Sequence, residues 1–113
     1  MEMNQEERGS VTLLSLSGQL DLFSAKSLRQ KVQELREAGK RRIIIDFKDV
    51  SYIDSSGVGA LLHVYSQARG GDFETRFVNL QSPVAHVIEL TKLTDYFPLA
   101  ESVERAEEEL AQN

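Results

Sequence analysis

Residues 52–62 read Tyr-Ile-Asp-Ser-Ser-Gly-Val-Gly-Ala-Leu-Leu and decide the fold. The apolar run Ile43–Phe47 precedes this stretch and is typical of a strand buried on both faces. After the stretch begins, apolar residues recur at helical spacing, at Val58, Leu61, Leu62, Tyr65 and Ala68. The stretch is therefore predicted to be a corner at which a central strand ends and a helix begins.

The corner itself is small and polar. Asp54, Ser55 and Ser56 are all residue types that cap helix N-termini, so one of these side chains is expected to accept from an amide of the first turn. Gly57 and Gly59 are expected to leave the backbone uncovered, so that a partner, or a group transferred from one, can approach closely. The helix dipole favours negative charge at this end. We therefore expect the functional site here.

Composition limits the class of protein. The chain has 113 residues and 41% hydrophobic content, which suits one compact domain. Its net charge of −5, with thirteen basic residues dispersed among eighteen acidic ones, argues against nucleic acid as a partner. The absence of cysteine excludes disulfides, thiol catalysis and thiolate metal sites.

The N-terminal residues and the apolar runs indicate where the chain acts. Residues 1–8 are polar and acidic, unlike a signal peptide, and no apolar run approaches the roughly 20 residues of a membrane helix. A cytoplasmic chain with no membrane partner is expected. Residues 1–9 show no periodicity and are expected to be flexible or to form a short edge, with a single domain over residues 10–113.

Strand-type and helix-type segments alternate along that domain. Strands are expected at residues 11–16, at 18–21 as a second short strand or a bend, at 43–47 in the centre, at 75–80, and at 97–99 as a short edge. Ser24 and Ser82 are expected to be the N-caps of two helices, with Pro83 in the first helical position of the second. Two more helices are expected to open at about Ser56 and at Ser102. The alternation predicts an α/β fold: one domain with a mixed four- to five-stranded sheet and about four helices.

Three stretches carry a family resemblance: Gly18–Asp21, residues 44–59, and Ser82-Pro83-Val84. The middle stretch is the specific one, because it joins a buried strand, the Asp-Ser-Ser-Gly corner and a second glycine two residues further on. Over residues 13–110 the chain resembles the STAS family, named for sulfate transporters and anti-sigma factor antagonists, and in particular its stand-alone bacterial antagonists.

That resemblance implies a function in partner switching. Unmodified antagonists of this kind bind an anti-sigma factor that is itself a protein serine kinase, which frees the sigma factor for transcription. The kinase then phosphorylates the serine directly before the motif glycine, here Ser56, and the phosphorylated form dissociates. A metal-dependent protein phosphatase resets it. The resemblance thus implies a regulatory binding protein, not an enzyme, that needs no cofactor.

The residues of the corner are consistent with such a switch. A phosphate adds about −1.5 to −2 charges at pH 7, and first-turn amides would partly accommodate it at Ser56. Asp54 already makes the site acidic, and Asp21 adds to this if the first corner folds alongside. A binding switch with little conformational change is expected. The partner-binding surface is expected to comprise Asp21, Asp54, Ser55, Ser56, Gly57 and Gly59.

Other interpretations of the same residues stay open. Ser55 or Ser56 could serve only as a capping hydroxyl, and Asp21 only as a turn residue. The same fold and corner could also belong to a STAS scaffold in a signalling assembly, or to an accessory subunit of a lipid-transport ATPase.

Catalytic and ligand-binding alternatives are weaker. A small serine hydrolase is disfavoured because His63 would lie roughly 10 Å along the helix from Ser56. Nucleotide binding is disfavoured because the two corner glycines lack the third glycine or the lysine of known phosphate loops. No set of histidine and acidic residues has the spacing of metal ligands, so no metal site is expected.

Overall fold

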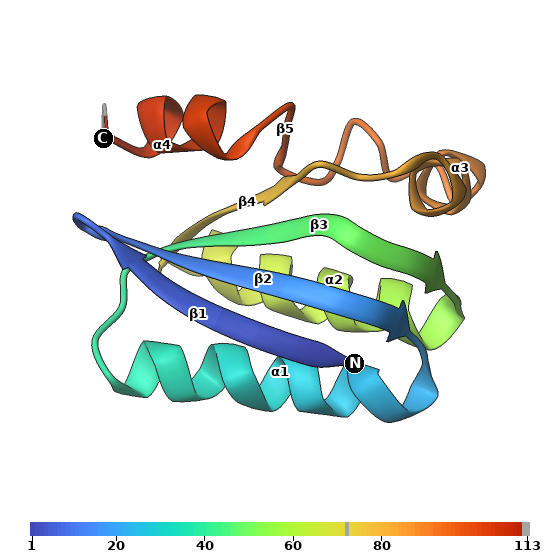
Figure 1. The fold of residues 1–113 in the computed structure, drawn as a ribbon, viewed down its shortest axis with the longest axis horizontal. Helices are drawn as coiled ribbons and strands as arrows, with labels where there is room; N and C mark the ends of the chain where they lie inside the picture. Colours follow the sequence, from blue (N-terminus) through green and yellow to red (C-terminus); the bar gives the residue numbers. More distant parts are fainter. Residues whose placement is uncertain (72, 112–113) are drawn as a thin grey trace.

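The computed structural model describes residues 1–71 and 73–111. Its centre is a sheet in the order β1-β2-β3-β4-β5, in which β1 is antiparallel to β2 and the other neighbouring pairs are parallel (Figure 1). The strands are β1 (Glu2–Arg8), β2 (Val11–Leu20), β3 (Arg42–Ile53), β4 (Glu74–Val78) and β5 (Leu99–Ala100). The helices are α1 (Leu22–Glu37), α2 (Ser55–Arg69), α3 (Ser82–Leu90) and α4 (Val103–Ala111). The predicted α/β fold with a mixed sheet is confirmed.

Apolar layers cover both faces of this sheet. Helices α1 and α2 lie on one face and α4 lies on the other (Figure 1). Alternate residues of β3 enter different layers, because successive side chains of a strand point to opposite faces. Ile43 and Ile45 pack in the layer of α1 and α2, whereas Ile44 packs in the layer of α4. All three are fully buried, which confirms the prediction of a central strand covered on both sides.

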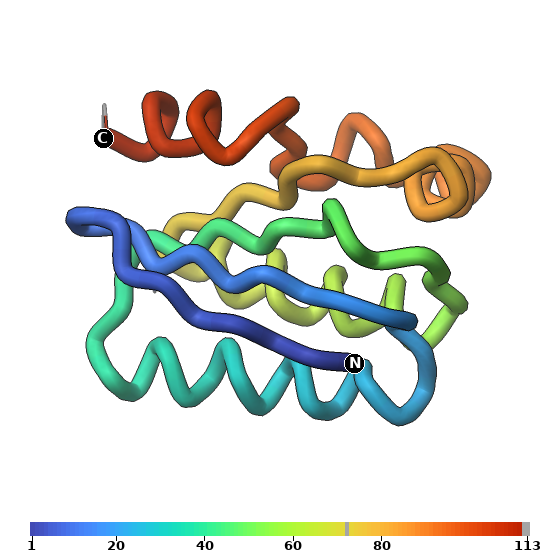
Figure 2. The backbone as a smooth tube through the Cα atoms, viewed as in Figure 1, coloured from blue at the N-terminus to red at the C-terminus, as the bar shows by residue number. Residues whose placement is uncertain are grey.

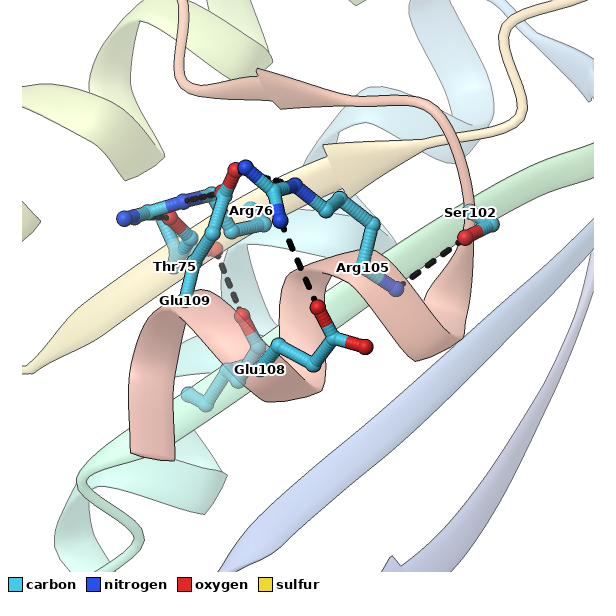
Figure 3. Close-up of polar contacts among 7 residues, drawn as sticks. Thr75, Arg76, Ser102, Arg105, Glu108 and Glu109 are labelled. Carbon is cyan, nitrogen blue, oxygen red and sulfur yellow. Dashed lines mark hydrogen bonds and ion pairs between the residues drawn. The ribbon is translucent and has the colours of Figure 1, made fainter. Parts of the chain in front are cut away.

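Helix α4 is attached to the sheet by polar contacts as well as by its apolar side (Figure 3). Arg76 of β4 donates from Nε to Glu109 Oε1 at 2.9 Å, and Arg105 pairs with Glu108 and Glu109 along the helix. The Ser102 hydroxyl accepts from the Arg105 amide at 3.0 Å, which confirms Ser102 as the residue that opens α4. The acidic side of α4 is therefore partly engaged in ion pairs.

The N-terminal residues form an edge strand. β1 pairs with β2 from Glu2 opposite Ser17 to Arg8 opposite Val11. Its side chains are mostly exposed, so it lacks the apolar alternation by which a strand is recognised in a sequence. Backbone pairing, together with ion pairs such as that of Arg8 with Glu107 at 3.1 Å, holds it in place. Of the two alternatives expected for residues 1–9, the structure forms the edge strand and not the flexible segment.

Several boundaries differ from the prediction, because capping and pairing rather than periodicity set them. The strands predicted at 43–47, 75–80 and 97–99 are Arg42–Ile53, Glu74–Val78 and Leu99–Ala100 in the structure. β2 continues through residues 18–20, so no separate second strand forms there. α1 begins earlier than predicted, since Asp21 and not Ser24 is its N-cap. α3 has Gln81 as its N-cap, which makes Ser82 its first helical residue.

The ends of β2 and β3 bring two helix starts together. Leu20 and Ile53 are register partners at the ends of these parallel strands, and the Asp54 amide donates to the Leu20 carbonyl at 3.3 Å. The chain then turns into α1 and α2 at the same end of the sheet (Figure 2). Asp21 and Asp54, the N-caps of the two helices, therefore lie in adjacent corners, as expected if the first corner folds alongside the second.

Candidate functional site

The N-terminus of α2 is the centre of the candidate site. Asp54 has an extended backbone, with φ −117° and ψ −173°, and its Oδ1 accepts a hydrogen bond from the Gly57 amide at 3.0 Å. Ser55 and Ser56 follow as the first two helical residues; Ser55 is exposed and Ser56 is half-buried. The capping role, which the sequence leaves open among three side chains, therefore belongs to Asp54.

This cap leaves backbone donors available at the start of α2. The first four amides of an α-helix have no acceptor within the helix. Of these four, the Asp54 amide donates to the Leu20 carbonyl and the Gly57 amide to the Asp54 carboxylate. The amides of Ser55 and Ser56 are the other two, and they point out of the helix where its dipole adds positive potential. The geometry suits an anionic group at this position.

The neighbouring start of α1 is closed by its own side chains. The Asp21 carboxylate accepts from the amides of Phe23 and Ser24, at 3.0 and 3.1 Å. The Ser24 hydroxyl accepts from the Asp21 amide at 2.9 Å, which completes a capping box. The bond from the Ser24 amide is the main reason why the pKa of Asp21 lies below its ordinary value of 3.8. Asp21 is thus a fixed negative charge beside the more open start of α2.

The two glycines of the corner have different environments. Gly57 is buried, and a Cβ at this position would lie 2.4 Å from the Leu20 carbonyl oxygen and 2.7 Å from Cγ1 of Ile53. Gly59 is exposed, and a Cβ there would have no neighbour within 4 Å. The expectation of uncovered backbone therefore holds at Gly59 and is wrong at Gly57, which instead permits close packing of α2 on the ends of β2 and β3.

The structure thus gathers the predicted residues at one end of the sheet, with one of them underneath. Asp21, Asp54, Ser55, Ser56 and Gly59 are all exposed or half-buried there. Gly57 contributes to the shape of this surface without lying on it.

The same end of the sheet also carries apolar side chains that sequence reasoning missed. Leu22 and Phe23, the first two residues of α1, are 65% and 84% exposed, and Tyr52 near the end of β3 is 47% exposed. A helical projection could have found Phe23, because it lies roughly 160° around the helix from the buried Ala25. The surface is therefore partly apolar as well as acidic.

The described residues offer little for catalysis or metal binding at this site. His63 is exposed on α2, seven positions after Ser56, and His86 is exposed on α3. Within residues 1–71 and 73–111, no group of three histidine or acidic side chains could hold a metal ion. Over the same residues, no helix has both the length and the apolar character needed to cross a membrane.

The fold and this site define a small α/β domain that displays hydroxyl groups at an open helix start. The chain belongs to the STAS domain family, whose model matches residues 2–106. The resemblance inferred from the corner residues is therefore confirmed, and the match also includes the residues of β1.

Several antagonists of anti-sigma factors are similar to this chain. The anti-sigma-B factor antagonist of Bacillus subtilis is 29% identical over 87 residues, which is 77% of this chain and 79% of the relative. The crystal structure of an anti-sigma factor antagonist from Mycobacterium paratuberculosis matches with a TM-score of 0.86 and 24% identity, over 97% of this chain and 93% of that one. The structure of the Bacillus cell fate determinant SpoIIAA in its phosphorylated form matches with a TM-score of 0.71 and 23% identity, over 98% of each chain.

Proposed function

We propose that this chain is an anti-sigma factor antagonist, a regulatory binding protein rather than an enzyme. In its unphosphorylated form it binds an anti-sigma factor that is a serine kinase, and so releases a sigma factor. The open start of α2, where two amides sit beside two hydroxyl groups, is the observation that carries this proposal. The names of the similar proteins support the same class of function.

Phosphorylation of Ser56 switches the complex off. A phosphate there carries about −1.5 to −2 charges, and the amides of Ser55 and Ser56 are placed to stabilise it within the free protein. A partner docked over the same surface meets this charge beside the carboxylates of Asp54 and Asp21. The added repulsion, bulk and desolvation therefore oppose binding while the fold is retained.

Different observations favour each of the two adjacent serines as the phosphorylated residue. Ser55 is the more exposed residue. Ser56 occupies the position that the family resemblance assigns to the phosphorylated residue, directly before the buried Gly57. We assign the modification to Ser56, with Ser55 as the neighbouring exposed hydroxyl.

The rest of the proposed cycle is taken from the family resemblance. A metal-dependent protein phosphatase removes the phosphate and restores binding. The cycle takes place in the cytoplasm, where a sigma factor and its inhibitor act on transcription. No cofactor and no nucleic acid take part in the binding step.

A phosphorylation assay with matched variants tests the proposal. The purified anti-sigma factor kinase of the source organism and ATP are incubated with the wild type, Ser56→Ala and Ser55→Ala, and the modified peptide is mapped by mass spectrometry. The wild type and Ser55→Ala should each gain one phosphate on Ser56, and Ser56→Ala should gain none and stay bound to the kinase. A phosphate mapped elsewhere, or purification of the chain with a transport ATPase instead of a kinase, contradicts the proposal.

A further inference from the structure

Two exposed apolar side chains, Leu22 and Phe23, form what is here called the α1 anchor. Phe23 is 84% exposed and Leu22 is 65% exposed, although both residue types are usually buried. Phe23 faces away from the core, roughly 160° around the helix from Ala25. Packing within the chain therefore does not explain its presence.

The backbone beneath the α1 anchor is held in place. The Phe23 amide donates to the Asp21 carboxylate at 3.0 Å, as part of the capping box that includes Ser24. A docking side chain on a fixed backbone loses less conformational entropy on binding than one on a flexible loop. The α1 anchor is thus preorganised for contact with another surface.

The backbone of the α1 anchor lies close to the start of α2. The Asp54 amide donates to the Leu20 carbonyl at 3.3 Å, and Phe23 is three residues beyond Leu20. At about 3.8 Å per residue, the Cα atom of Phe23 lies within roughly 11 Å of that of Leu20. A standard interface buries about 800 Å² on each partner and is roughly 30 Å across, so one partner can cover both features.

Charge indicates which partner fits. Asp21 directly precedes the α1 anchor, Asp54 caps the adjacent helix α2, and the net charge of the chain is −5. A second copy docked symmetrically on this surface would bring like carboxylates together, which disfavours self-association. A partner with basic side chains around an apolar pocket is complementary instead.

A cleft beside Phe23 gives such a partner room. Its volume is about 440 Å³, and it is lined by Met1, Gln19, Asp21, Phe23, Ser24 and Ser27. Four of the six lining residues are polar, and one of them is Asp21, whose carboxylate is ionised at neutral pH and has a pKa below its ordinary value. A basic group at the rim of the partner's pocket could therefore enter beside the ring.

We infer that the α1 anchor is a docking element for the anti-sigma factor, inserted into an apolar pocket with a basic rim. The inference rests on the proposed function and deepens it: the α1 anchor contributes affinity and partner choice, whereas Ser56 carries the switch. Because the α1 anchor does not include the phosphorylated residue, the two contributions are separable by substitution.

The test uses calorimetry to measure the Kd between the purified anti-sigma factor kinase and the unphosphorylated protein. Four forms of the protein are compared: wild type, Phe23→Ser, Leu22→Ser and Leu90→Ser. Leu90 is the matched control, since it is 67% exposed on α3. Loss of one buried side chain of this size corresponds to about a 10- to 100-fold weaker Kd. Phe23→Ser and Leu22→Ser should show this loss, with unchanged thermal unfolding, and Leu90→Ser should bind as the wild type does.

Three results would overturn the inference. If Phe23→Ser and Leu22→Ser both bound the kinase with wild-type affinity, the α1 anchor would have no role in docking. An equal loss in Leu90→Ser would show dependence on general surface hydrophobicity. A wild-type dimer in sedimentation that Phe23→Ser dissociates would assign the α1 anchor to self-association. Failure of the proposed function is distinguishable from these, because it is seen as absence of phosphate on Ser56 in the wild type after incubation with kinase and ATP.

Discussion

At the scale of single residues, two glycines two positions apart perform different tasks. Gly57 lets α2 approach the Leu20 carbonyl, and so brings the two N-caps together, whereas Gly59 faces open space. The sequence alone does not distinguish them, because the difference depends on the register of β2 against β3. Only the packed structure shows which glycine lies beneath the site.

Alanine substitutions separate these two roles. Gly57→Ala should destabilise the protein by about 1–3 kcal/mol, because its Cβ overlaps backbone that cannot move freely. Gly59→Ala should be neutral or stabilise by up to about 1 kcal/mol, because alanine favours the helix and meets no neighbour. Urea unfolding of the wild type and both variants measures these changes in the free energy of unfolding. A Gly59→Ala variant that is less stable than Gly57→Ala would contradict the assignment.

The charge of Asp21 has a pH-dependent effect on stability. Its folded pKa lies below 3.8, chiefly through the Ser24 amide, so the ionised carboxylate stabilises the folded state above pH 3.8. This contribution is lost as pH falls through the folded pKa. Asp21→Asn keeps a capping oxygen without the charge. The wild type should therefore have a higher urea midpoint of unfolding than Asp21→Asn at pH 7, and the difference between the two midpoints should shrink below pH 3.8. A difference that stays constant with pH would show that the carboxylate charge is not its cause.

At the scale of elements, periodicity predicts the buried parts and misses the rest. The central strand and the helices that follow Ser56 and Ser102 are found because their apolar residues repeat. The sequence leaves residues 1–9 open between a flexible segment and a short edge, because pairing with β2, and not an apolar pattern of its own, makes β1 a strand. Leu22 and Phe23 are missed as surface residues because the N-cap lies at Asp21, three residues before the predicted Ser24. Capping and strand register are thus the information that periodicity lacks.

The cap of α2 gives a prediction at this scale. Asp54→Ala removes the acceptor of the Gly57 amide, which should cost about 0.5–2 kcal/mol. Asp54→Asn retains an acceptor and is the matched control. Amide hydrogen exchange should show faster exchange at Gly57 in Asp54→Ala than in Asp54→Asn. Equal protection in the two variants would mean that the side-chain cap does not hold this end of the helix.

At the scale of the whole molecule, phosphorylation is expected to change the surface of the domain while its fold is kept. Ser55 and Ser56 at the start of α2 lie outside both apolar layers, and their amides can donate hydrogen bonds to an added anion. Phosphorylated protein should therefore keep its unfolding temperature within about 5 °C of the unmodified form. Backbone NMR shifts should change mainly near the starts of α1 and α2. Widespread shift changes would instead indicate a conformational switch.

The most direct test of the central claim compares one binding constant in two states of the protein. The Kd of the anti-sigma factor kinase is measured for the unmodified chain and for the chain carrying phosphate on Ser56, in the same buffer. Like charge and desolvation at the start of α2 should weaken binding at least about 100-fold. Equal Kd values for the two forms would contradict the account.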